Sequence, residues 1–357
     1  MIPALQYYRA LAAILVVLYH AACVFGPTGY YPGQSWETVF LFGHAGVELF
    51  FVLSGFIICH VHYDRVNRPG ELVSYIQKRL TRIYPPVFLA VAAWAAFRLA
   101  GGTPLSGMEW MVSLTLIPFE FVYAPPILWT LSFEMAFYAL FLVAFLDRRL
   151  FVAATILWGA SGYALFMLDR TEGVNTVFGS AYSILFSFGI LAFFIVRKAP
   201  PLSLTVRLLL AAIATALFAY AACADVAIQL GDLPARAQAV QSRQFTLVFG
   251  AAGVIFVVLC ADPRVRLPGR AHRLLGFLGD ASFAIYLWHL FPQRILARTL
   301  DDMGLSGADA RAAGFALLVI TGIAAGAIVH VWIERPMIAW INGWISRFRQ
   351  GRAALKH

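Results

Sequence analysis

Charged residues are scarce in this chain. Asp, Glu, Lys and Arg make up 13% of its 357 residues, and 61% are hydrophobic. Because a soluble domain carries roughly 25% charged residues, this composition excludes a large soluble core and predicts an all-α bundle that crosses a membrane several times. Cysteine is rare too, and no close pairing implies a disulfide framework or a metal site. The four cysteines are Cys23, Cys59, Cys223 and Cys260.

Ten hydrophobic segments are candidates to cross the bilayer, because about 20 apolar residues at ~1.5 Å each span its hydrocarbon core. They cover residues 4–25, 37–60, 83–100, 126–146, 150–168, 177–196, 206–224, 244–261, 276–298 and 312–333. An even number of spans places both termini on the same side of the membrane. The first segment is too long and too polar for a cleaved signal peptide, so we expect it to stay in the mature protein.

The distribution of basic residues predicts the orientation. The alternate loops 26–36 and 102–125 contain no Lys or Arg, and cytoplasmic loops carry the excess of both. Both termini are therefore predicted to be cytoplasmic, and the net charge of +9 reflects membrane topology rather than a nucleic-acid partner. The basic residues assigned to the inner side are Arg65, Arg68, Lys78, Arg79, Arg82, Arg148, Arg149, Arg197, Lys198, Arg207, Arg264, Arg266, Arg270, Arg273, Arg335, Arg347, Arg349, Arg352 and Lys356.

No loop is long enough to fold alone, and no internal repeat is evident. We expect one membrane domain over residues 1–336, followed by a basic amphipathic tail over 337–357 on the cytoplasmic surface. Loop 102–125 is half apolar and rich in proline, which favours a re-entrant or interfacial segment on the outer face. The paired, interrupted helices of a repeat-built transporter are not apparent.

Arg9 and His20 both lie inside the first hydrophobic segment. A charge at that depth costs about 2.5–3.5 kcal/mol, so such residues normally face the bundle interior and have a function. Eleven residues correspond to three helical turns plus about 20°, which puts both side chains on one face and separates them by about 16 Å along the axis. Arginine binds anions and histidine handles protons, so the pair predicts a polar track through the membrane.

Other polar residues fall at a depth similar to that of His20 in the outer half. Histidine paired with a carboxylate is a common general base, since the carboxylate orients the ring and stabilises its charged form. We therefore predict a catalytic pair of His20 and Glu134. The remaining candidates for contacts on the acceptor side are His44, Glu48, Tyr286 and His289.

A second cluster is expected at the inner end. Arg79 and Arg82 precede the third span, Arg9 lies about one turn inside the first, and Glu334 and Arg335 close the last span. A guanidinium can bind two phosphate oxygens at once. A phosphate site on the cytosolic side joined to a His–Glu site predicts a long ligand along the bundle axis, and an acyl-CoA such as acetyl-CoA has that shape.

The same residues carry a resemblance to a known family. The motifs occur in the order YYRALAAILVVLYH, GVELFFVLSGFIICH, KRLTRIYP, WTLSFEMAFY, GDASFAIYLWHL and ERP. This order resembles the acyltransferase-3 family of bacterial membrane O-acyltransferases over nearly the whole chain, and the first and fourth motifs look most like exopolysaccharide acetyltransferases of the succinoglycan type. The resemblance matches its Arg–His pair to Arg9 and His20, its Arg-x-x-Arg pair to Arg79 and Arg82, and its glutamate to Glu134.

The resemblance implies an acyl-CoA donor from the cytosol, a glycan hydroxyl as acceptor and a location in the bacterial inner membrane. Together with the residues it predicts transfer of an acyl group, in the first instance acetyl, to an exported or lipid-linked polysaccharide. His20 would be the general base or a transient acyl carrier, and the sequence leaves both open. The alternative is a proton-coupled transporter or a flippase of a lipid-linked glycan, in which the same residues would relay protons.

Overall fold

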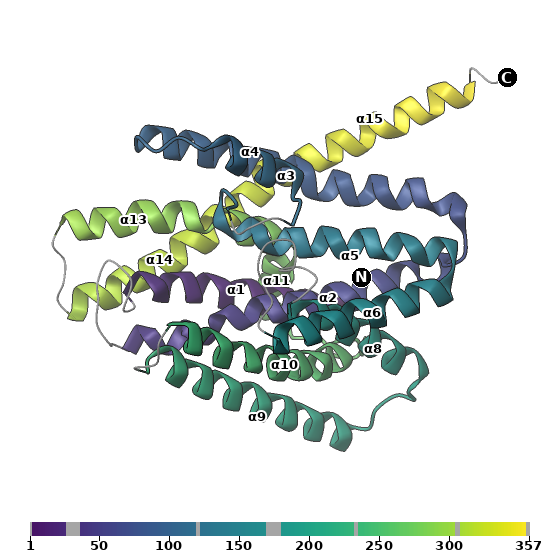
Figure 1. Ribbon diagram of the computed structural model, residues 1–357, viewed down its shortest axis with the longest axis horizontal. Helices are drawn as coiled ribbons and strands as arrows, with labels where there is room; N and C mark the ends of the chain where they lie inside the picture. The colour runs from purple at the N-terminus through teal and green to yellow at the C-terminus, as the bar shows by residue number, and fades with distance from the viewer. Residues whose placement is uncertain are drawn as a thin grey trace.

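The computed structural model describes residues 2–25, 36–118, 122–168, 180–231, 235–303 and 308–354. These residues form helices and connecting turns, with no β-strand among them. Figure 1 shows most of the helices lying alongside one another in a single bundle. The predicted all-α membrane fold is confirmed. Most of loop 26–36 lies outside the described part, so the structure does not bear on it.

The helices follow one another along the chain as a membrane bundle with few long connections. They are α1 (Pro3–Phe25), η1 (Trp36–His44), α2 (Ala45–His62), η2 (Tyr63–Arg65), η3 (Pro69–Glu71), α3 (Leu72–Ala100), α4 (Gly107–Thr115), η4 (Pro126–Leu128), α5 (Trp129–Leu146), α6 (Arg148–Met167), α8 (Tyr182–Lys198), α9 (Leu204–Gln229), α10 (Ala235–Cys260), α11 (Gly269–Asp280), α12 (Ser282–Trp288), α13 (Leu290–Asp302), α14 (Ala308–Val329), η5 (His330–Glu334) and α15 (Arg335–Ala354).

Seven helical segments in the described chain are long and apolar enough to cross a membrane, and the bent segment α11–α13 makes an eighth if it counts as one span. Its two parts, Gly269–Asp280 and Ser282–Asp302, meet at 57°. The other two of the ten predicted spans correspond to shorter helices. α8 has 17 residues, and the apolar part of α10 covers Gln244–Cys260. At ~1.5 Å per residue each is about 25 Å long, slightly less than the hydrocarbon core.

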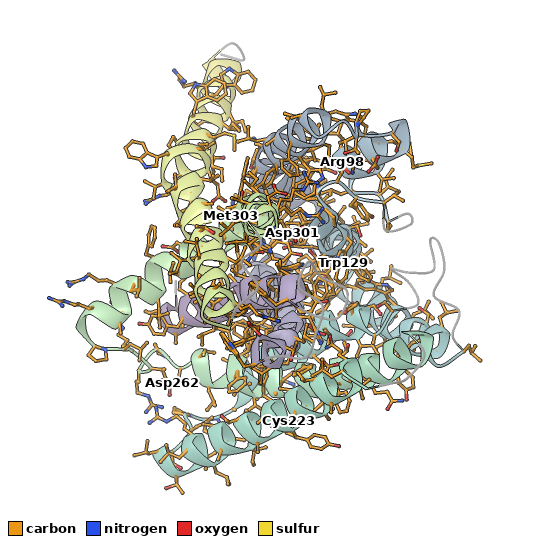
Figure 2. All side chains as sticks on the ribbon, turned by 90° about the vertical axis from the view of Figure 1, so that its left-hand side faces the viewer. Arg98, Trp129, Cys223, Asp262, Asp301 and Met303 are labelled. Carbon is orange, nitrogen blue, oxygen red and sulfur yellow. The ribbon has the colours of Figure 1, made fainter. Side chains whose placement is uncertain are left out.

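Helix α1 lies at the centre of the bundle. It contacts α2, α10, α11, α12, α13 and α14, and Figure 2 shows the N-terminal helices between the others, with α9 and its Cys223 at the edge. Ala10, Ala12, Ala13 and Ala21 are completely buried on α1. Small side chains allow neighbouring helices to approach closely in a membrane, where packing rather than the hydrophobic effect drives association. The centre of the bundle is therefore where α1 presents Arg9 and His20.

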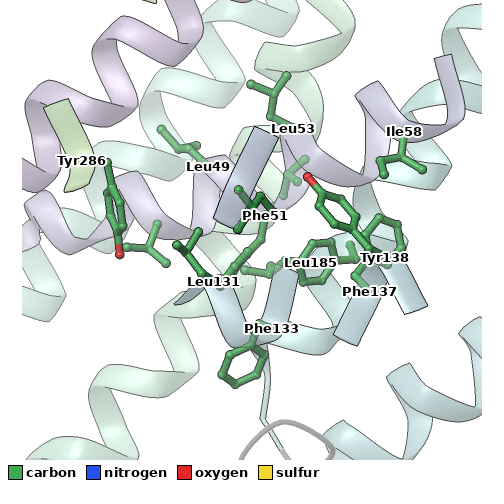
Figure 3. Packing of buried hydrophobic residues seen from close by; sticks show 14 of the residues in the cluster. Leu49, Phe51, Leu53, Ile58, Leu131, Phe133, Phe137, Tyr138, Leu185 and Tyr286 are labelled. Carbon is green, nitrogen blue, oxygen red and sulfur yellow. The ribbon is translucent and has the colours of Figure 1, made fainter. Parts of the chain in front are cut away.

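A cluster of aromatic side chains joins α2, α5 and α8. The rings of Phe137 and Phe186 stack with their centroids 4.4 Å apart, and Phe51 packs 4.9 Å from Phe186. Figure 3 shows this cluster, with Tyr138 and Tyr286 on opposite sides of the view. Each such ring pair stabilises the fold by about 0.5–1.5 kcal/mol beyond what the burial of its apolar surface contributes. This packing fixes α5, which carries Glu134.

The segment predicted to be re-entrant or interfacial forms α4, whose nine residues are too few to cross a bilayer. Ser106 and Glu109 cap its first turn reciprocally. The Ser106 backbone N–H donates to Glu109, which lowers the pKa of that carboxyl. Between α10 and α11, hydrogen bonds from Arg264 lower the pKa of Asp262 to about 2. Glu109 and Asp262 thus each stabilise a segment that lies outside the candidate membrane spans.

The predicted tail is helical. α15 follows α14 and η5 along the chain, and Ala310–Arg347 forms one continuous helical segment of 38 residues. At ~1.5 Å per residue that segment is about 57 Å long, roughly twice the hydrocarbon thickness, so part of it lies outside the bilayer core. Figure 1 shows α15 extending away from the bundle. The boundary at residue 336 and the position of the tail on the membrane surface stay predictions.

Candidate active site within the membrane

A cavity of about 100 Å³ lies inside the bundle between α1, α2, α3, α5 and α12. The three predicted donor residues Arg9, Arg79 and Arg82 line it together with Glu134. Thr130 and Tyr286 also line the cavity, and the Tyr286 hydroxyl lies 2.7 Å from Thr130 Oγ1 and donates to the Ile127 carbonyl at 3.0 Å. The arginines predicted to form a cluster therefore lie around one cavity.

Neighbouring side chains hold Arg79 in place. Its Nη2 donates to His62 Nε2 at 2.9 Å, and its guanidinium lies over the rings of Tyr75 and Tyr138, at 5.5 and 5.2 Å. The Tyr138 hydroxyl in turn donates to Glu134. Arg79 Nε is buried and has no hydrogen-bond partner among the described residues. A buried donor without a partner is unfavourable by about 1–3 kcal/mol, and an anion in the cavity would supply the missing acceptor.

A second, more open cavity of about 360 Å³ adjoins the first. Arg9, Arg82 and Phe283 line both of them. The second cavity adds Lys78 and Arg335 as cations, and Asp280 and Glu334 as carboxylates. His330 Nδ1 lies 2.7 Å from Glu334 Oε2. Four cationic side chains against two acidic ones leave an excess of positive charge, which favours an anionic ligand.

His20 lies farther along α1 and pairs with another histidine. Its Nδ1 is 3.1 Å from His289 Nε2 and 2.9 Å from the Val16 carbonyl oxygen. His289 Nδ1 is 2.7 Å from the carbonyl oxygen of Tyr286 and 3.1 Å from that of Ile285. His289 is fully buried, whereas His20 is partly exposed. Tyr286 lines the first cavity and its carbonyl oxygen faces His289, so Tyr286 connects the cavity wall to the histidine pair, although neither histidine lines the cavity itself.

His44 and Glu48, the other acceptor-side candidates, lie in a network of their own. His44 Nδ1 is 3.2 Å from Glu48 Oε1, and His44 Nε2 is 2.8 Å from Asp225 Oδ2. Both carboxylates are completely buried. The ring of Tyr19 separates this network from His20, with centroids 5.8 Å from His44 and 5.0 Å from His20. The candidates predicted at one depth thus form two adjacent groups rather than one site.

The structure does not bring the predicted pair of His20 and Glu134 together. Among the described residues His20 makes no hydrogen bond with Glu134, whose partner is Tyr138. Glu134 shares its cavity with the arginines instead. Counting residues from the membrane surface predicted the depth, but a pairing also depends on how each helix is rotated and tilted.

Three neighbours of the site were missed in the sequence. Asp225 is the only carboxylate in the apolar helix α9, and a lone buried acid there was a signal. His62 and His330 lie near the ends of their segments that are predicted to face the cytoplasm, where a polar side chain is expected at the membrane surface. Glu334 is four residues after His330, so helical spacing could have indicated that pair, but nothing in the sequence linked His62 to Arg79.

Charged and titratable side chains that face each other inside an apolar helical bundle are typical of a membrane protein with an internal reaction or transport path. Comparison with known families decides the class. A protein family described as an acyltransferase domain matches residues 2–335 of this chain. The chain belongs to the acyltransferase-3 family and is a multi-pass membrane acyltransferase.

Three known sequences are similar over most of their length. The exopolysaccharide production protein ExoZ of Rhizobium meliloti is 31% identical over 84% of this chain and 90% of its own length. BcsY of Komagataeibacter xylinus is 26% identical over 97% of this chain and 86% of its own. The acyltransferase MdmB of Streptomyces mycarofaciens is 26% identical over 94% and 91%. No solved structure matches the chain significantly.

Proposed function

We propose that this protein transfers an acyl group, in the first instance acetyl, from cytosolic acyl-CoA to a hydroxyl of an exported or lipid-linked polysaccharide at the bacterial inner membrane. One observation carries the proposal. Two adjoining cavities lined by Arg9 and Arg82 extend to Tyr286, whose carbonyl oxygen lies 2.7 Å from His289 Nδ1 in the His20–His289 pair. Phosphates and a reactive carbonyl on one long ligand match these two ends.

The donor assignment rests on charge and length. Arg9, Arg82 and Lys78 surround the more open cavity, where a polyphosphate head would bind. Along α1, Arg9 and His20 are separated by about 16 Å, since the helix rises ~1.5 Å per residue. A thin, flexible arm of that length would bring a thioester to the imidazole while the phosphates stay among the arginines. ExoZ is named an exopolysaccharide production protein, which supports a polysaccharide as the acceptor.

The chemistry at His20 requires no metal. His20 Nε2 accepts the proton of the acceptor hydroxyl as its oxygen forms a bond to the thioester carbonyl carbon. The carbon–sulfur bond then breaks, and the imidazolium returns the proton to the CoA thiolate. In the acyl-carrier variant Nε2 attacks the thioester carbonyl and the CoA thiolate leaves; the acceptor hydroxyl then attacks the acyl-imidazolium, takes the acyl group and gives its proton to the thiolate. Glu134 would balance the charge of the arginines rather than orient His20.

The test uses the purified protein in detergent with radiolabelled acetyl-CoA and candidate glycans. Replacement of His20 by Ala should lower acyl transfer by about 10²–10⁴-fold, because a general base contributes that much. CoA binding should change less than twofold, since the phosphate end is remote. His60→Ala is the matched control, because His60 is exposed at the end of α2 and should leave transfer unchanged.

Near-normal transfer by the His20 variant would refute this mechanism. Failure of the wild-type protein to use any acyl-CoA, combined with movement of a lipid-linked glycan across a vesicle membrane, would refute the enzyme and establish the transporter or flippase. Turnover in detergent cannot come from a transporter, because detergent micelles hold no gradient.

A further inference from the structure

The two histidines of the site are joined by a chain of hydrogen bonds whose direction can be worked out. At one end, the carbonyl oxygens of Tyr286 and Ile285 face His289 Nδ1 at 2.7 and 3.1 Å. A carbonyl oxygen only accepts, so His289 carries its proton on Nδ1. In the neutral ring the other nitrogen, Nε2, is then a lone pair that accepts.

The same reasoning determines which ring nitrogen of His20 carries the proton. Its Nδ1 faces two acceptors, the His289 Nε2 lone pair at 3.1 Å and the Val16 carbonyl at 2.9 Å. His20 therefore carries its proton on Nδ1. Its Nε2 makes no hydrogen bond within the described part of the chain, and the side chain is partly exposed. The free lone pair is on the nitrogen that a general base or acyl carrier would use.

The surroundings hold His289 rigidly in this role. It lies at the junction of α12 and α13, and one turn later the buried amide of Gln293 donates to the Val17 carbonyl at 3.1 Å and to the Leu318 carbonyl at 3.4 Å. These bonds tie α13 to α1 and α14. A Cβ at Gly322 would lie 3.3 Å from His289 Cβ, so α14 packs closely behind the ring.

We propose that His289 is a positioning residue, a neutral hydrogen-bond acceptor that fixes His20 with its proton on Nδ1 and its Nε2 free. The proposal rests on the proposed function and gives His289 a different role from contact with the acceptor. When His20 takes the hydroxyl proton, its bond to His289 becomes charge-assisted and roughly twice as strong. His289 thus does what a carboxylate does in a catalytic triad, but without placing a negative charge in the membrane.

A first measurement needs no activity. In protein labelled with ¹⁵N-histidine, the His20 signals are identified by their loss in His20→Ala. We expect His20 Nδ1 to show the shift of a protonated nitrogen and Nε2 that of an unprotonated one. The opposite assignment would overturn the proposal, whatever the enzyme turns over.

The second measurement compares variants at position 289. His289→Gln can place its amide oxygen where Nε2 was, so it should retain at least a third of kcat. His289→Asn and His289→Leu offer no acceptor there, and kcat should fall by about 10–100-fold, the range expected for one hydrogen bond to a charged group. KM for acetyl-CoA should change less than twofold in all three, because the phosphates bind elsewhere.

The outcomes separate the two proposals. If wild-type protein transfers acetyl and His20→Ala does not, but Leu and Gln at position 289 behave alike, His289 only fills space and the positioning role is refuted. If the wild type transfers no acyl group, the proposed function fails, and the ¹⁵N measurement still decides the tautomer. Melting temperatures of the purified variants identify any that are unfolded. If His289→Leu does not fold, the comparison of His289→Gln with His289→Asn still tests the positioning role.

Discussion

At the scale of single residues, the polar side chains inside this bundle differ in what they are bonded to. His44 is bonded to both Glu48 and Asp225, which is the arrangement expected of groups that hold η1 and the start of α2 against α9. Arg82 has no hydrogen bond or ion pair within the described residues and is exposed to both cavities. A cation without a bonded partner among these residues is a stronger candidate for a ligand contact than one already bonded within the bundle.

Arg82→Ala is therefore the sharpest test of the donor site. Loss of one charge-assisted phosphate contact should raise KM for acetyl-CoA about 10–100-fold with little change in kcat. Arg82→Lys should restore part of the affinity, because lysine keeps the charge but not the two-pronged geometry. Arg149→Ala, at an exposed arginine on the predicted inner side, is the control. Equal KM values for Arg82→Ala and Arg149→Ala would remove Arg82 from the donor site.

At the scale of elements, α2 and α8 approach each other closely through two glycines. A Cβ at Gly55 would lie 2.2 Å from the Phe186 carbonyl oxygen, and one at Gly189 would lie 2.0 Å from the Val52 carbonyl oxygen. Both atoms belong to the backbone, so no side chain can move aside. This contact sets the spacing of α2 and α8, and with it the aromatic cluster that supports α5.

Gly189→Ala should destabilise the protein by at least the 1–3 kcal/mol typical of overpacking, because the helices must separate. We expect a lower melting temperature in detergent and a smaller folded fraction on size exclusion. Gly276→Ala is the matched control, since a Cβ there meets no atom within 4 Å and alanine favours the α11 helix. A Gly189 variant that melts like the Gly276 variant would contradict the close approach.

At the scale of the whole molecule, the cytosolic donor depends on which end of the bundle faces inward. The cavities with Lys78, Arg82 and Arg335 are at the end predicted to be cytoplasmic. α4 follows the opposite end of α3, after its last residue Ala100. Acyl-CoA is found in the cytosol, so the proposed function requires this orientation.

Cysteine labelling can test the orientation. In a variant without the four native cysteines, Gly107→Cys on α4 should react with an impermeant maleimide added to intact cells, and Gly70→Cys should react only after lysis. A Cβ at either glycine meets no atom within 4 Å, so neither change should disturb the fold. Protection of position 107 together with labelling of position 70 would reverse the topology and refute a cytosolic donor.

The sequence by itself determined the class of protein and its most costly residues. Long apolar segments predict membrane helices, and Arg9, His20 and Glu134 stand out because charge is expensive there. Arg79 and Arg82 are three residues apart on one helix, so their proximity also follows from local geometry. These conclusions depend only on neighbours in the chain.

Only the tertiary structure decided which polar groups meet. The His20–His289 contact joins residues 269 apart in the chain, and the His44–Asp225 contact joins residues 181 apart. Lipid is as apolar as the bundle interior, so a membrane helix carries little hydrophobic pattern to show how it is rotated. Helix order, rotation and the bend between α11 and α12 therefore had to come from packing, and they replaced the expected partner of His20, Glu134, with a histidine.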